Sequence, residues 1–156
     1  MDIQIKVGII VINERGDILL IKEKLEKNSI SLWNIVKGSY QGGETIMQAA
    51  IRECMEEASA NVKLLSSLGT YVAEEQGKIR AQFNFLARAN SDIIALALEK
   101  DQQSRGEAIE DTCWFTRENV GKIGKEEFAS LRAYQLIQDW LSGKEFPIDS
   151  IQQVSM

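Results

Sequence analysis

One amphipathic helix, preceded by a glycine-rich turn, places the strongest constraint on how this chain can fold. Gly42 and Gly43 favour a turn, and Thr45-Ile46-Met47-Gln48 matches a capping box, in which two side chains satisfy free amides at a helix start. Apolar residues then recur at helical spacing, namely Met47, Ala50, Ile51, Cys54 and Ala58. The pattern predicts a helix from residue 45 onward whose apolar stripe packs against the rest of the fold.

Strand-like segments precede this helix. Ile3 to Ile12 alternates and is rich in β-branched residues, residues 13–17 form a turn cluster, and Ile18 to Ile21 is apolar, so a β-hairpin is predicted. Residues 22–31 are charged and polar and indicate a loop. A short strand from Trp33 to Val36 is predicted to end at Lys37-Gly38.

The segment after the helix predicts a second hairpin. Its strands are Val62 to Ala73 and Ile79 to Ala89, joined by the turn at residues 75–78. Thr112 to Phe115 is predicted to add a strand, whereas most of residues 90–111 fit either a strand, a helix or a loop.

The C-terminal part predicts a second amphipathic helix, from Glu126 to Leu141, before the only proline, Pro147. The resulting order of β, β, α, β, β, β, α indicates an α+β sandwich. With 156 residues and 44% hydrophobic residues, one domain covering residues 1–156 is expected.

Charge and segment composition exclude several classes of function. A net charge of −5 with scattered Lys and Arg disfavours a protein that binds nucleic acid by neutralising many phosphates. No apolar run is long enough to span a bilayer, and the start of the chain lacks a basic segment followed by an apolar one. We therefore expect a cytoplasmic protein with no membrane contact, and the sequence leaves open whether it forms a homodimer.

Histidine is absent and cysteine is scarce, which narrows the available chemistry. Without histidine there is no Ser-His or Cys-His dyad and no histidine metal ligand. Cys54 and Cys113 lie far apart in apolar or helical patterns, so buried reduced thiols are expected rather than a disulfide or a zinc site. If the chain is an enzyme, carboxylates must do the chemistry.

Three carboxylates share one face of the first helix. Glu53, Glu56 and Glu57 stand at i, i+3 and i+4, where they repel one another unless a cation lies between them. Carboxylate oxygens are the ligands that Mg²⁺ accepts while it keeps sites for water and substrate phosphates. The alternative is a solvated acidic helix face without function.

The wider spacing favours the metal site. Gly38, five residues, Glu44, seven residues, Arg52-Glu53, two residues and Glu56-Glu57 resembles the Nudix box, which here extends from Gly38 to Ala60. Cys54, Ser59 and Ala60 depart from the pattern in packing positions and at the helix end, and no charged ligand is lost. The resemblance implies the Nudix α/β/α sandwich with a mixed central sheet, and a MutT-like pyrophosphohydrolase.

The resemblance also implies a role for each box residue. Glu53, Glu56 and Glu57 would hold Mg²⁺ or Mn²⁺, together with a backbone carbonyl near Lys37 or at Gly38. Arg52 would orient the neighbouring glutamates, with Glu44 as a hydrogen-bond acceptor in the same network. Glu53 is the first candidate for the general base, so that Glu53, Arg52 and Glu57 form the expected catalytic group.

Residues outside the box have weaker signals. Residues 106–115 resemble the family's acidic loop before a Trp-Phe strand, so Glu107 or Glu110 is a further candidate ligand or base, against the alternative of a solvated loop. Lys37 is a candidate phosphate contact or simply a surface charge. Trp114 is a candidate wall of a base pocket or a core residue.

The resemblance implies hydrolysis of a nucleoside diphosphate linked to another group. A nucleoside triphosphate cleaved to a monophosphate and pyrophosphate is the first hypothesis, because a proline expected in ADP-ribose hydrolases is missing and Gly77 stands near where dinucleoside polyphosphate hydrolases have tyrosine. The alternatives are a dinucleoside polyphosphate or RNA 5′-end hydrolase, or a Nudix-fold nucleotide-binding module that hydrolyses nothing.

Overall fold

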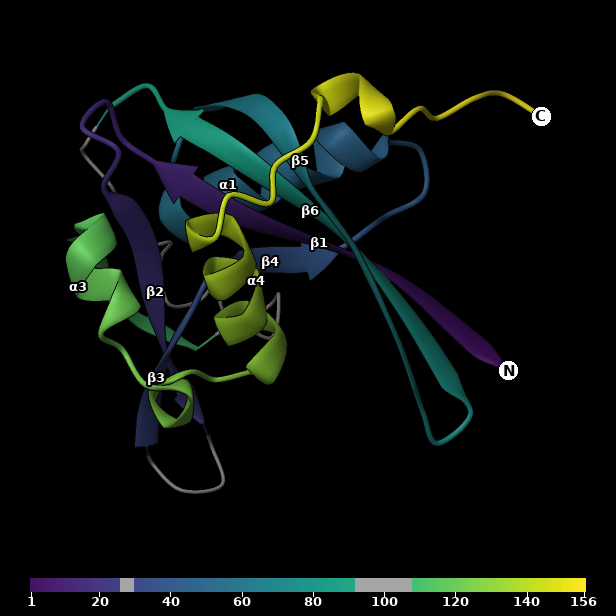
Figure 1. Cartoon of the computed structure of the whole chain (residues 1–156). Helices are drawn as coiled ribbons and strands as arrows, with labels where there is room; N and C mark the ends of the chain where they lie inside the picture. The colour runs from purple at the N-terminus through teal and green to yellow at the C-terminus, as the bar shows by residue number, and fades with distance from the viewer. Residues whose placement is uncertain (26–29, 92–107) are drawn as a thin grey trace.

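The computed structural model, which describes residues 1–25, 30–91 and 108–156, shows a mixed seven-stranded sheet between helices (Figure 1). The strand order is β3-β2-β1-β6-β5, with β4 paired to β1 and β7 paired to β2. Among the paired strands of the described residues, β1 and β6 alone run parallel. The strands are β1 (Asp2–Ile12), β2 (Ile18–Leu25), β3 (Ile30–Asn34), β4 (Val36–Ser39), β5 (Val62–Glu75), β6 (Lys78–Ala89) and β7 (Ile109–Phe115).

Alternation along the central strands produces two cores, one on each face of the sheet. Val7 and Ile9 of β1 join the core that includes buried residues of α1 (Ile46–Ala58). Ile10 and Ile12 join the core beneath α3 (Arg117–Gly121) and α4 (Leu131–Leu141). Because successive side chains of a strand point to opposite faces, α1 and α4 cover opposite faces of the sheet, as Figure 1 shows. The predicted α+β sandwich with a mixed sheet is confirmed.

The start of α1 has the predicted capping box. The Thr45 hydroxyl accepts from the Gln48 amide at 3.1 Å, and the Gln48 side chain accepts from the Thr45 amide at 2.8 Å. The Ile46 amide donates to the side chain of Gln153, so the C-terminal segment also contributes to this cap. The helix is therefore fixed at the end that leads in from β4.

The helix ends at Ser59, which takes the left-handed conformation that glycine takes in the family pattern. Its φ is 50° and its ψ is 33°, and its amide donates back to carbonyls of the last turn. For a residue with a side chain this conformation costs roughly 1–2 kcal/mol. The sequence departure therefore leaves the helix end unchanged in shape and introduces local strain.

We expect Ser59→Gly to raise the free energy of unfolding by about 0.5–1 kcal/mol, since the relief of strain exceeds the extra chain entropy that glycine loses. Urea denaturation would measure the change. Ser59→Ala is the matched control, because it keeps the Cβ atom and should bring no gain. Equal stabilities of the glycine and alanine variants would contradict the assignment of strain to this position.

The first predicted hairpin is confirmed only at its base. β1 and β2 are antiparallel and pair at Ile12 and Ile18, while most of β1 pairs with β6 and β4. The predicted loop at residues 22–31 is wrong at both ends, because β2 continues to Leu25 and β3 begins at Ile30, with the residues between lying outside the described part. Cross-strand pairing with β7 and β3 overrides the polar composition there.

The second predicted hairpin is confirmed. β5 and β6 are joined by Gln76 and Gly77, both with positive φ, as tight hairpin turns require. Figure 1 shows this hairpin extending away from the helices beside the N-terminal end of β1.

The last predicted helix is too long at its start. α4 begins at Leu131, where Ser130 caps it by accepting from the Ala133 amide. Phe128 is extended and forms a bridge with Trp33, which prevents the helix from starting at Glu126. β7 begins earlier than predicted, α3 was not predicted, and residues 92–107 of the undecided segment lie outside the described part.

Both cysteines are free, as predicted. Cys54 is buried in α1, and burial raises the pKa of its thiol. Cys113 is exposed, so its predicted burial is wrong; it lies on β7, which pairs with β2. In the parts of the chain that the structure describes, no helix has the length and apolar character needed to cross a membrane.

Candidate active site

Arg52 is the centre of a network that links α1 to the turn and strand before it. Its Nε and Nη2 donate to the two carboxylate oxygens of Glu44 at 3.0 and 2.8 Å. Its Nη1 donates to Glu53 at 2.8 Å and to Glu56 at 3.2 Å, and Nη2 also reaches the Ser39 carbonyl at 2.9 Å. The hydrogen bond with Arg52 lowers the pKa of Glu44, and the same pair raises the pKa of Arg52.

Glu57 is held against the edge of β4. Its side chain is only 3% exposed, and its Oε1 accepts from the Lys37 amide at 2.8 Å. Burial raises the pKa of the Glu57 carboxyl to about 8, although the charge and the backbone amide of Lys37 oppose the shift. A carboxylate buried this deeply needs positive charge beside it to be stable as an anion.

Gly38 allows β4 to lie directly against Glu53. A Cβ atom at Gly38 would be 1.9 Å from Cδ of Glu53 and 2.0 Å from its Oε1. Glu53 is itself buried, with 7% of its surface exposed. Glycine is therefore required here by the close approach of a carboxylate, and its φ is not positive.

Backbone groups of alternate residues of β4 point toward α1. The Lys37 amide and the Ser39 carbonyl both bond to side chains of α1. In an antiparallel ladder the amide and carbonyl of one residue point to the same side, so the Lys37 carbonyl is expected on the side of the glutamates. Its role as a metal ligand, like that of the Gly38 carbonyl, stays a prediction.

The three glutamates of α1 accept hydrogen bonds from donor groups of the protein itself. Within residues 1–25, 30–91 and 108–156, no three acidic or thiol groups are already gathered as a metal cage. Glu53 and Glu56 are bonded to Arg52 and Glu57 to a backbone amide. The donor set nevertheless fits a hard divalent cation, because three carboxylates on adjacent turns of one helix, two of them buried, offer oxygen ligands with net negative charge.

Glu23 and Asn34 belong to the site and were missed in the sequence. The Lys37 ammonium donates to Glu23 at 2.6 Å, and Asn34 donates to the other oxygen of Glu23 at 3.3 Å. Desolvation opposes the charge of Lys37, but Glu57 and Glu23 outweigh it and raise the pKa of Lys37. Lys37 is therefore paired, contrary to the surface-charge alternative, and no local pattern marks Glu23, which approaches only through folding.

The remaining predicted residues are not gathered with the α1 glutamates in the described part of the chain. Glu110 of β7 is exposed and accepts from the Ser31 hydroxyl, while Glu107 lies outside the described residues. Trp114 is half-buried and packs against the core beneath α1. Its role at a base pocket therefore stays a prediction.

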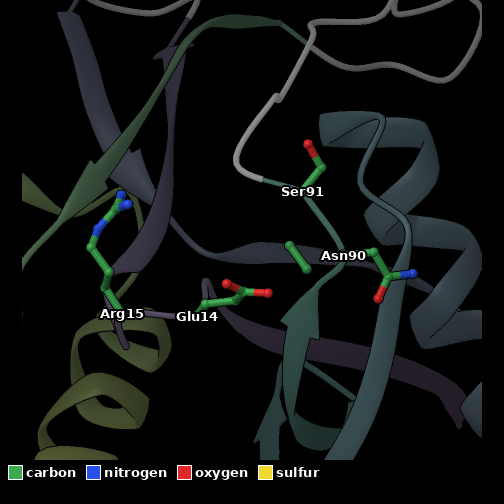
Figure 2. Close-up of a pocket in the computed structure, with 5 residues that line it drawn as sticks. Glu14, Arg15, Asn90 and Ser91 are labelled. Carbon is green, nitrogen blue, oxygen red and sulfur yellow. The ribbon is translucent and has the colours of Figure 1, made fainter.

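A separate pocket of about 250 Å³ lies near the β1–β2 turn. It is lined by Glu14, Arg15, Ala89, Asn90 and Ser91, and Figure 2 shows Glu14 extending toward Asn90 while Arg15 extends away. None of the predicted site residues lines it. It is therefore distinct from the acidic surface of α1.

The fold is a mixed sheet between helices, in which an arginine holds an acidic helix against a glycine-containing strand. The NUDIX domain family model matches residues 2–138. The chain therefore belongs to the Nudix hydrolase family. Members of this family generally need a divalent metal ion.

Similar proteins agree with this assignment. The 8-oxo-dGDP phosphatase NUDT18 of Homo sapiens is 30% identical over 111 residues, which are 71% of this chain and 32% of that protein. A Bacillus subtilis (strain 168) protein provisionally named 8-oxo-dGTP diphosphatase is 38% identical over 63 residues, 40% of either chain. The chain thus spans well under two thirds of these curated relatives.

A solved NUDIX hydrolase from Nitrosomonas europaea has the same fold, with a TM-score of 0.77 and coverage of 97% of both chains. Its sequence is 22% identical to this one, so the likeness concerns the fold.

Proposed function

We propose that this protein is a metal-dependent pyrophosphohydrolase that cleaves a nucleoside triphosphate to a monophosphate and pyrophosphate. The observation that supports this most is the retention of Glu53, Glu56 and Glu57 on one helix, two of them buried, with Arg52 bonded to the first two. Burying carboxylates without a fixed cation is unfavourable. A site that binds Mg²⁺ and phosphates explains why they are there.

In this proposal the three glutamates and a backbone carbonyl at Lys37 or Gly38 hold Mg²⁺, with Mn²⁺ as the alternative. When bound, the ion supplies charge neutralisation on the anhydride. Glu53 is the first candidate to take a proton from the attacking water, and Arg52 keeps the glutamates in position through its fixed fork of donors. Glu44 anchors Arg52 from the far side.

The relatives direct attention to particular substrates. The names of the human and Bacillus subtilis proteins refer to 8-oxo-dGDP and 8-oxo-dGTP. We therefore place oxidised guanine deoxynucleotides first among the substrates to test, ahead of dinucleoside polyphosphates and RNA 5′ ends. The cytoplasmic location and the oligomeric state stay predictions from the sequence.

The experiment is a product assay with 8-oxo-dGTP, 8-oxo-dGDP, the common nucleoside triphosphates, ADP-ribose and a dinucleoside tetraphosphate, each with Mg²⁺ or with chelator. We expect turnover that requires the metal, with pyrophosphate released from the triphosphates. Stoichiometric nucleotide binding without turnover on any of them would favour the binding-module alternative. Release of orthophosphate alone from the triphosphates would contradict the proposed cleavage position.

A further inference from the structure

The face of the sheet below α4 has a polar region next to β4. Lys6 and Gly8 of β1 are paired with Gln82 and Asn84 of β6, so all four positions share one face. The register of β4 places Ser39 opposite Lys6 on the same face. This region continues the apolar surface that packs under α4, but its residues are polar.

Two buried amides form the floor of this region. Asn84 is fully buried and Gln82 is 5% exposed, and the Gln82 Nε2 donates to the Asn84 Oδ1 at 2.8 Å. A Cβ atom at Gly8 would come within 2.7 Å of Gln82 and 2.8 Å of Asn84, so the glycine makes room for the pair. The Asn84 Nδ2 has no partner, and a buried donor without an acceptor is costly.

Three cations, Lys6, Arg80 and Arg132, lie close enough for their charges to act on one another, and no ion pair is found for them in the described part of the chain. Lys6 donates to the Ser39 hydroxyl at 2.7 Å, and Arg80 donates to the neutral side chain of Gln4 at 3.0 Å. Arg132 of α4 has a buried Nε without a partner. The two buried polar atoms without a partner here, the Asn84 Nδ2 and the Arg132 Nε, are therefore both hydrogen-bond donors.

The positive charges act on one another. Burial, and then the charges of Arg80, Lys37 and Arg132, lower the pKa of the Lys6 amine. Burial and the charge of Arg80 likewise lower the pKa of Arg132, and the charge of Glu75 opposes this shift. In a chain with a net charge of −5, cations without an ion pair next to buried donors fit an anion that presents several oxygen acceptors.

This cationic region adjoins the carboxylates of α1. The Ser39 hydroxyl accepts a hydrogen bond from Lys6, and the Ser39 carbonyl accepts one from Arg52. One residue of β4 therefore connects the cationic region to the network of the α1 glutamates. Glu53 also acts electrostatically on Lys6. An extended polyphosphate with one part at the glutamates could therefore place its next charged group near Lys6.

We propose that Lys6, Arg80 and Arg132, with the free amide hydrogens of Asn84, bind the terminal phosphate of the substrate. The inference rests on the proposed function and makes it more specific, because it selects nucleoside triphosphates over diphosphates. The names of the human and Bacillus subtilis relatives differ in this respect, since one refers to a diphosphate and the other to a triphosphate.

The first test compares kcat/KM for dGTP and dGDP in wild type, Lys6→Met and Arg132→Gln. Wild type should prefer the triphosphate, and each variant should lose about tenfold on dGTP, the effect of one charge-assisted hydrogen bond, with little change on dGDP. Arg88→Gln is the matched control, since Arg88 is an exposed arginine on the same strand as Arg80. Equal losses on both substrates, or no loss, would overturn the inference while leaving the hydrolase intact.

The second test measures binding of inorganic pyrophosphate by calorimetry in the presence of chelator. Weaker binding in Lys6→Met and Arg132→Gln, by about tenfold, with Arg88→Gln equal to wild type, supports the site even if no nucleotide is turned over. Pyrophosphate binding that is the same in all four proteins, or absent in wild type, overturns it. Failure of turnover alone counts against the proposed function only.

Discussion

Replacing Glu57 with glutamine is expected to lower metal-dependent kcat by about 10³-fold, the scale seen when a preorganised electrostatic group is removed from an active site. Glutamine has nearly the shape of glutamate and keeps an oxygen that can accept from the Lys37 amide. What it loses is the negative charge. Product release with Mg²⁺ on the best substrate of the panel measures the effect.

The Glu57→Gln variant should fold as well as wild type, so a loss of activity would be due to the lost negative charge. Burial raises the pKa of Glu57 to about 8, because desolvation disfavours the charged carboxylate at this position. Removing the charge therefore should not lower the thermal stability measured with chelator. Glu74→Gln, at an exposed position of β5, is the matched control and should keep full activity. Turnover at the wild-type rate in Glu57→Gln would exclude Glu57 as a required metal ligand.

The parts of the site that the sequence predicted are those defined by short spacing. The Thr45 capping box is local, so it formed as expected. The separations among Glu53, Glu56 and Glu57 are shorter than two helical turns and need only the helix itself to bring the carboxylates to one face. Their proposed role as ligands still awaits the measurements above.

The parts that the sequence did not predict depend on strand pairing. Glu23 reaches Lys37 because β2 and β4 both pair with β1, although 14 positions separate the two residues along the chain. Asn84 meets Gly8 only because β1 and β6 pair in parallel with one particular register. Such contacts follow from long-range pairing, which neither periodicity nor local propensity specifies. A polar segment such as residues 22–25 was likewise recruited into a strand by its neighbours.

Gly38→Ala is expected to reduce activity far more than stability. The added Cβ would overlap the carboxylate of Glu53, which is the end of a flexible side chain and can move aside. The displaced carboxylate would lose its 2.8 Å contact with Arg52. A misplaced group at this level can cost about 100-fold in kcat, while the loss in unfolding free energy should be about 1 kcal/mol.

Gly42→Ala is the control that separates the effect of displacing the Glu53 carboxylate from the effect of adding a methyl group. Gly42 also precedes α1, but a Cβ atom there meets nothing within 4 Å, and its φ is not positive. Both variants add one methyl group to the same glycine-rich segment, so chain entropy changes alike in the two proteins. A 100-fold loss in Gly38→Ala with wild-type kcat in Gly42→Ala would show that the position of Glu53 determines turnover. Wild-type activity in both would mean that Glu53 can move without consequence, and the general base would then have to be sought elsewhere.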